Sequence, residues 1–140
     1  MNTIDTRDLI ERRDELKQQI LDSFLETFEH YAEDTDTFED IRLDEEELES
    51  WRENWEDELT EIEEIDEIES EVTDFKYGEC LIDESDFTEY CEELVEELGY
   101  LQHPIPPFIK DNIDWEGVAA DLSADYINVD YQGVTYLVRS

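Results

Sequence analysis

Cations are scarce in this 140-residue chain: nine Lys and Arg stand against 45 Asp and Glu, a formal net charge of −36 at pH 7. A surface so acidic repels phosphate groups, which excludes nucleic acid and anionic membranes as partners. Glycine is also rare, and the four glycines form no phosphate-binding loop. Apolar residues nevertheless make up 39% of the chain, enough for a folded core.

Residues for metal binding and nucleophilic catalysis are equally sparse. Cys80 and Cys91 lack metal-type spacing, and His30 and His103 are isolated from them and from each other. The stretch "DTDTFEDIRLDE" resembles a calcium loop but has Glu39 where the turn needs glycine. No carboxylate is set in the apolar pocket that a general acid requires. We therefore expect no enzyme, no metal and no cofactor.

Long apolar runs are missing as well. No stretch approaches the roughly 20 apolar residues of a membrane span, and the N-terminal residues contain no apolar core of a signal peptide. Two cysteines in such a chain are best interpreted as reduced thiols. We expect a cytoplasmic protein in a bacterial host cell.

The charge divides the chain unevenly. Residues 1–25 carry a net charge of −2, residues 26–74 carry −22 and residues 75–140 carry −12. Within the middle third, residues 44–74 hold 17 carboxylates and one arginine, yet their apolar residues recur at helical spacing. The middle third therefore combines a regular helix with extreme negative charge.

Two long helices are predicted in the N-terminal half. The first spans about 5–32, with Asp5 or Thr6 as N-cap, and the second spans about 44–72. Residues 33–40 are short and polar, which favours a connection. Both apolar stripes follow near-heptad steps, so we expect an antiparallel hairpin over residues 1–74. The stripes are Leu9, Leu16, Ile20, Phe24, Phe28 and Tyr31 in the first helix, and Leu48, Trp51, Trp55, Leu59, Ile62, Ile65 and Val72 in the second.

Trp51 and Trp55 lie one helical turn apart in the second stripe. Such a pair could anchor a partner on the surface. Their place in the seam favours core packing over the anchor interpretation.

The pattern changes after residue 75. An amphipathic helix capped by Asp83 or Ser85 is predicted to end at Leu98, with Gly99 after it. The prolines of residues 103–108 predict an extended loop. A short helix capped by Asp114 follows, and then a hairpin turning at Gln132–Gly133. We expect residues 75–140 to form a small module of two helices with a β-hairpin or three-stranded sheet, so that the whole chain is α+β.

The acidic helix has a charge density close to that of DNA. Residues 44–74 would span about 46 Å as a helix and carry a net charge of −16, roughly one charge per 3 Å. B-DNA carries one phosphate per about 3.4 Å on each strand. The pattern therefore indicates a DNA mimic that occupies the DNA-binding cleft of a basic protein.

The partner-binding residues of this hypothesis form a distributed acidic surface rather than a single site. A homodimer is left open as a further association. The surface is assigned to Glu45, Glu46, Glu49, Glu53, Glu56, Asp57, Glu61, Glu63, Glu64, Asp66 and Glu67.

Three other interpretations compete with mimicry. Salt adaptation predicts an even charge distribution, whereas the first 25 residues are nearly neutral. A disordered acidic tail would not keep a seam of tryptophan and isoleucine. An acidic chaperone or adaptor for a basic nucleic-acid-binding partner stays open.

The C-terminal stretch "FIKDNIDWEGVAADLSADYINVDYQGVTYLVR" resembles the end of small acidic antirestriction proteins from phages and plasmids, the ArdA type among them. The resemblance covers about 32 residues and implies a DNA-mimicking inhibitor of restriction-modification enzymes. The sequence leaves a CRISPR effector or a nucleoid protein open as the target. The same side chains also suit the core of a compact αββ unit, which would make this segment a scaffold for the acidic surface. The matching residues are Ile113, Asp114, Trp115, Glu116, Asp121, Leu122, Tyr126, Gly133 and Tyr136.

Overall fold

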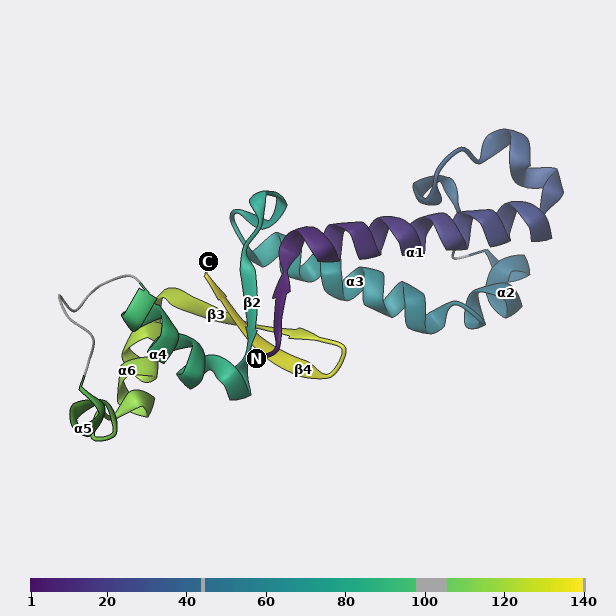
Figure 1. Ribbon diagram of the computed structural model, residues 1–140. Coiled ribbons are helices and arrows are strands. Elements are labelled where there is room, and N and C mark those ends of the chain that lie inside the picture. Colours follow the sequence, from purple (N-terminus) through teal and green to yellow (C-terminus); the bar gives the residue numbers. More distant parts are fainter. Residues whose placement is uncertain (44, 98–105, 140) are drawn as a thin grey trace.

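The computed structural model describes residues 1–43, 45–97 and 106–139, and it is elongated (Figure 1). A helical hairpin projects from one side of a small sheet, and a second group of helices covers the sheet's other side. The α+β fold class is confirmed. In the described residues no helix is long and apolar enough to cross a membrane.

The hairpin is built from three helices. Its outgoing arm is α1 (Thr6–Thr27), and its returning arm comprises the short α2 (Glu49–Glu53) and α3 (Glu56–Glu71). Asp5 caps α1 by accepting a hydrogen bond from the backbone N–H of Arg7, at 2.9 Å. This N-cap is as predicted from the sequence.

The predicted bounds of both long helices are wrong at the far end of the hairpin. α1 stops at Thr27 rather than near residue 32, and 3₁₀ turns follow at Glu29–Asp34, Phe38–Asp40 and Glu46–Leu48. The second helix breaks at Trp55, whose φ of −114° and ψ of 13° are not helical. Asn54 and Trp55 both have modest helix propensity. The break between α2 and α3 lets the indole rings of Trp51 and Trp55 pack in the same apolar cluster.

The sheet contains four antiparallel strands in the order β1-β2-β4-β3. They are β1 (Thr3–Asp5), β2 (Cys80–Asp83), β3 (Tyr126–Tyr131) and β4 (Val134–Arg139). The hairpin of β3 and β4 has the predicted turn: Gln132 and Gly133 both have positive φ, at 50° and 79°. Strand β1 was not predicted, and it joins the sheet from the other end of the chain.

The remaining helices lie on the side of the sheet opposite the hairpin (Figure 1). They are α4 (Phe87–Glu97), α5 (Pro107–Lys110) and α6 (Trp115–Leu122). Helices α4 and α6 pack on that face of the sheet. Asp114 caps α6 as predicted, accepting from the Gly117 N–H at 3.1 Å. The predicted helix end at Leu98 and Gly99, and the loop over 103–105, lie outside the described residues. Pro107 begins α5, so the predicted extended loop does not continue to residue 108.

Three apolar clusters hold these layers together. The root of the hairpin packs on one face of the sheet, where Leu9 and Ile65 meet Leu81 and Val138. The far half of the hairpin has its own core around Ile20, Phe24, Trp51 and Ile62. On the opposite face of the sheet Ile82 and Leu137 contact Phe87, Cys91 and Ala119. The hairpin is therefore cohesive along its length and seated on the sheet.

A buried threonine joins the root of the hairpin to the sheet. Thr6 is fully buried, its hydroxyl donates to the Phe75 carbonyl at 2.6 Å, and it accepts from the Glu79 N–H at 2.8 Å. The backbone N–H of Thr6 also donates to the Glu79 carbonyl at 2.9 Å. The start of α1 and the chain leaving α3 are fixed to each other by this residue.

The two tryptophans of the hairpin differ in burial, so truncating them should differ in cost. Trp51 is 8% exposed, and Trp51→Ala should lower the free energy of unfolding by about 3–5 kcal/mol. Trp55 is only partly buried, and Trp55→Ala should cost about 1–2 kcal/mol, because part of its ring already faces water. Urea unfolding followed by circular dichroism measures both. Equal losses would contradict the burial of the two rings.

Candidate functional site: an acidic hairpin

Most carboxylates of the hairpin face solvent. Of the 29 described Asp and Glu residues within 1–74, 25 are exposed. Among the predicted partner-binding residues, the exposed ones are Glu45, Glu46, Glu49, Glu53, Glu56, Asp57, Glu63, Asp66 and Glu67.

Glu61 and Glu64 are the two residues of this set that are not exposed, and for Glu61 the predicted place on the surface is wrong. Glu61 is 8% exposed. Its carboxylate accepts hydrogen bonds from the Arg12 guanidinium at 2.7 Å and from the Tyr131 hydroxyl at 2.8 Å. Arg12 belongs to α1 and Tyr131 to β3. Glu61 therefore joins both arms of the hairpin to the sheet instead of facing a partner.

The surroundings of Glu61 favour its ionised form. Burial opposes the charge, but the hydrogen bonds from Arg12 and Tyr131 outweigh it, and the pKa of Glu61 is lowered from its usual value. The pKa of Tyr131 is raised by burial and by donation to this carboxylate, so its hydroxyl keeps its proton. Glu61 is therefore ionised, and its charge holds the hairpin to the sheet.

Three more of the predicted surface residues have contacts inside the protein. Glu64 accepts from both the backbone N–H and the side-chain amide of Gln132, at 3.1 and 2.8 Å. Asp66 pairs with Arg13 at 2.8 Å, and Glu45 lies 3.9 Å from Arg42. Glu64 is only partly exposed, so it contributes less to the outer surface than Glu63 or Glu67.

Three cations of α1 are paired with carboxylates elsewhere in the hairpin. Arg13 contacts both Asp66 and Glu69, and Lys17 contacts Glu39 at 2.7 Å. Arg12 and Arg13 thus place positive charge between the two arms, and Lys17 places it between α1 and the connecting segment, where it offsets repulsion. Because these cations are paired within the hairpin, its outer faces stay acidic.

The exposed carboxylates form two rows on the outer faces of the antiparallel helices. Helical periodicity places each row on the side of its helix that points away from the apolar seam. The row on α1 comprises Asp8, Glu11, Glu15, Asp22 and Glu26, and the row on α3 comprises Glu56, Glu63, Glu67 and Glu71.

The two rows can be compared with the strands of a duplex. Two packed helices are about 20 Å across, which is comparable to the width of B-DNA. Over the roughly 27 Å that the rows extend, nine carboxylates give about one charge per 3 Å. Duplex DNA has one per about 1.7 Å. The hairpin therefore reproduces the two-edged arrangement at about half the charge density.

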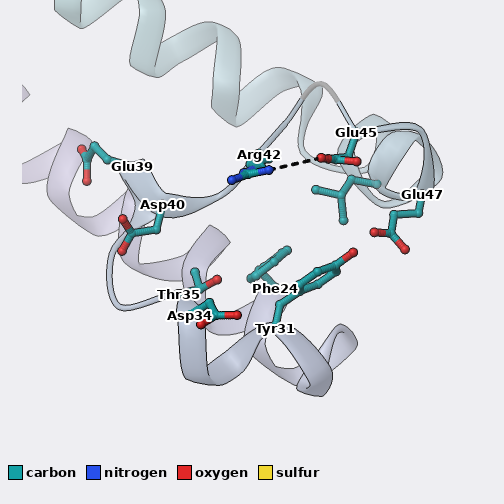
Figure 2. Close-up of a pocket in the computed structure, with 10 residues that line it drawn as sticks. Phe24, Tyr31, Asp34, Thr35, Glu39, Asp40, Arg42, Glu45 and Glu47 are labelled. Carbon is teal, nitrogen blue, oxygen red and sulfur yellow. Dashed lines mark ion pairs between the residues drawn. The ribbon is translucent and has the colours of Figure 1, made fainter.

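The far end of the hairpin contains an acidic pocket of about 570 Å³ (Figure 2). Phe24 and Tyr31 contribute aromatic walls, and Arg42 extends toward Glu45 across the opening. The Arg42 side chain is 82% exposed, so this single contact is weak. The carboxylates around the pocket are Asp34, Glu39, Asp40, Glu45 and Glu47.

An aromatic hollow of about 610 Å³, the distal groove, lies between α1 and α2. Its apolar walls are Phe28, Trp51 and Trp55, and its polar lining is Ser23, Thr27, Glu47, Ser50 and Asn54. Trp51 is fixed there because its indole N–H donates to the Ser23 hydroxyl at 3.0 Å. Trp51 is thus a core residue, as the seam predicts, whereas Trp55 is half-buried at the edge.

The described residues contain no group of three or more His, Cys, Asp or Glu that could hold a metal ion. Cys80 and Cys91 are free thiols, and burial raises the pKa of both, which disfavours the thiolate. His30 packs on Tyr31 with ring centroids 4.1 Å apart.

The segment that resembles antirestriction proteins supports the root of the acidic hairpin and contributes little to the hairpin's outer surface. It forms α6, β3 and β4, where Tyr136 is buried and Leu122 and Tyr126 pack against the third apolar cluster. Trp115 donates its indole N–H to the Lys110 carbonyl at 3.2 Å. These residues have scaffold roles.

Sequence reasoning missed the inward role of Glu61 and its partners Arg12 and Tyr131. The available signal was position: Glu61 directly precedes Ile62 and lies one turn before Ile65, both in the apolar stripe. Arg12 similarly lies between Leu9 and Leu16. A carboxylate and an arginine beside facing stripes indicate a pair across the seam.

Comparison with protein-family models, curated proteins and solved structures gave no match to this chain. The resemblance to antirestriction proteins therefore stays a prediction.

The buried network at Glu61 leads to a pH-dependent prediction. Glu61→Gln should lower the free energy of unfolding by about 1–2 kcal/mol at pH 7, because two hydrogen bonds lose their charge. The pKa of Glu61 is lower in the folded protein than in the unfolded chain. The stability difference between the wild type and Glu61→Gln is therefore fully present above the unfolded-state pKa, and it disappears as the pH falls through the folded-state pKa. Urea unfolding of both proteins from pH 7 to pH 3 measures it.

Glu63→Gln is the matched control, because Glu63 lies on the exposed side of the same helix. Its substitution should change stability by no more than about 0.5 kcal/mol. If Glu61→Gln behaves like Glu63→Gln at every pH, the inward role of Glu61 is wrong.

Proposed function

We propose that the protein is a DNA-mimicking inhibitor that occupies the DNA-binding cleft of a bacterial defence protein, either a restriction-modification enzyme or a CRISPR effector. The observation that carries this proposal is the pair of carboxylate rows on opposite edges of the hairpin. A cleft lined with Lys and Arg is attracted to such an object by the same charge steering that draws it to duplex DNA.

The dimensions of the hairpin support this function. α1 has 22 residues and is therefore about 33 Å long, which corresponds to about ten base pairs of B-DNA. The hairpin projects away from the sheet, so its outer edges are not covered by the rest of the described chain (Figure 1). A cleft can close around it as it closes around a short duplex.

The function requires charge rather than chemistry at the surface. An exposed carboxylate on a helix resembles a phosphate in charge, and single contacts of this kind each contribute little. The inhibitor would act by occupying the cleft, with the sheet and the helices behind it holding the hairpin in shape.

The first functional prediction concerns competition. The protein should displace a fluorescent 30-base-pair duplex from its target enzyme with one-site competition, and its affinity should fall steeply between 50 and 200 mM salt. Fluorescence anisotropy measures both effects on a panel of restriction-modification and CRISPR complexes. Inhibition that excess duplex does not relieve would argue for an adaptor or allosteric role.

The second concerns which carboxylates act. The quadruple variant Glu56→Gln, Glu63→Gln, Glu67→Gln and Glu71→Gln should weaken inhibition at least about 100-fold and flatten its salt dependence, because four exposed charges are lost from one edge. Each single substitution should have a small effect.

The matched control removes the same charge elsewhere. Glu84, Glu89, Glu93 and Glu97 are exposed on the opposite side of the sheet, and their joint change to Gln should leave inhibition nearly intact. Equal losses in both quadruple variants would show that net charge alone, and not the hairpin, determines binding. Melting temperatures establish that both variants fold.

The third separates mimicry from salt adaptation. The hairpin has an apolar seam and internal ion pairs, so it should keep its helical circular dichroism at 10 mM salt, where exposed charges repel over about 30 Å. Recovery of helix only in molar salt would favour a salt-adapted protein.

A further inference from the structure

The distal groove differs from the rest of the hairpin surface because its walls are aromatic. Phe28, Trp51 and Trp55 line it, and it lies between the ends of the two arms, away from the sheet. An aromatic hollow on a surface otherwise covered by carboxylates is unlike anything on DNA. The carboxylate rows therefore do not account for this groove, and the proposed function needs a separate role for it.

The geometry of the rings is well defined. The Trp51 ring stands edge-on to Phe28, with centroids 6.0 Å apart and an interplanar angle of 86°. The ring centroid of Trp55 lies 6.5 Å from that of Trp51. Because the indole N–H of Trp51 is bound to Ser23, that ring is a fixed wall, and the half-buried Trp55 supplies the accessible face.

The rim of the groove is negatively charged. Glu47 lines the groove directly, and Glu46, Glu49 and Glu53 are exposed on the same short segment. The nearby Arg52 turns to a different partner and donates to the Leu43 carbonyl. An aromatic face beside carboxylates favours an organic cation.

The protein already holds one of its own cations in this manner. The Lys17 ammonium lies 5.4 Å from the centroid of the Phe38 ring and 2.7 Å from a Glu39 oxygen. One aromatic ring and one carboxylate thus bind a cation beside the middle of α1. Trp55 and Glu47 offer the same pair of groups to a cation from outside.

We propose that the distal groove binds an arginine side chain of the basic partner, with the guanidinium stacked on Trp55 and paired with Glu47. This inference rests on the proposed function, for which it names a partner contact. Arginine fits better than lysine because its planar group stacks on an indole and pairs with a carboxylate at once. The basic cleft of a DNA-binding protein supplies such side chains in abundance.

The contact would give the inhibitor something that DNA lacks. Binding through the carboxylate rows weakens as salt rises, whereas a guanidinium partly buried against an indole is screened much less. An anchored arginine would therefore hold the complex under conditions in which a duplex dissociates.

The direct test uses N-acetylargininamide as the probe and the complete protein as the receptor. The indole N–H signals of the three tryptophans, Trp51, Trp55 and Trp115, are followed by ¹H–¹⁵N NMR during the titration. We expect saturable shifts at Trp55 and smaller ones at Trp51, with Trp115 unchanged. N-acetylcitrullinamide has the same shape without the charge and should produce no saturable shift.

Two substitutions locate the site. Trp55→Ala and Glu47→Gln should each weaken argininamide binding about fivefold or more. Tyr77→Ala is the control, because Tyr77 is 71% exposed beside the sheet, away from the groove, and should have no effect. Equal shifts at Trp115, equal binding of citrullinamide, or undiminished binding by folded Trp55→Ala would each overturn the proposal.

This titration needs no target enzyme, so its outcome is independent of the proposed function. If the protein binds argininamide but does not compete with duplex DNA for a target, the arginine site is supported and the DNA-mimic proposal is wrong. If it competes with DNA but does not bind argininamide, the DNA-mimic proposal is supported and the arginine site is wrong. If both hold, Trp55→Ala should weaken inhibition most at high salt, whereas the quadruple carboxylate variant should lose most at low salt.

Discussion

Repulsion between carboxylates is the constraint that the rest of this structure must satisfy. With a net charge of −24 over residues 1–74, the hairpin can form only if attraction along its seam exceeds repulsion across its surface. Apolar contacts supply most of that attraction, through residues such as Ile20 and Ile65 that are fully buried. Cations of α1 supply the rest: Arg12 and Arg13 pair with carboxylates of the returning arm, and Lys17 pairs with Glu39 of the connecting segment. Negative charge is thereby displaced to the outer faces.

The same arrangement fixes the direction in which the hairpin points. Thr6 ties the start of α1 to the chain after α3, and Glu61 connects both arms to Tyr131 of the sheet. These contacts are buried or partly buried, so they are protected from the screening that weakens surface ion pairs. A hairpin anchored at its root can present two rows of charge in a constant geometry. The sheet and its covering helices therefore serve the acidic surface without belonging to it.

Sequence patterns predicted the elements whose apolar residues recur regularly. The two stripes of the hairpin, the Asp5 and Asp114 caps and the β3–β4 turn are all present, because each depends on neighbouring residues alone. Strand β1 could not be predicted, since three residues acquire strand structure only by pairing with β2, nearly 80 residues later. The break at Trp55 and the inward turn of Glu61 also depend on tertiary contacts. Composition predicted an acidic surface, but only the fold distinguishes carboxylates that face solvent from those that hold the hairpin together.

That distinction bears on how a DNA mimic acquires specificity. A surface of distributed charge attracts every basic cleft, because each carboxylate contributes little and none requires a particular partner. Selectivity needs a contact that depends on geometry, and such contacts are commonly buried aromatic anchors. At the far end of this hairpin the helical pattern is broken, and there Trp55 is half-exposed beside Glu47. In the proposed function, the departure from a regular helix places a directional contact at the tip, while the regular helices behind it would supply the long-range attraction for a basic protein.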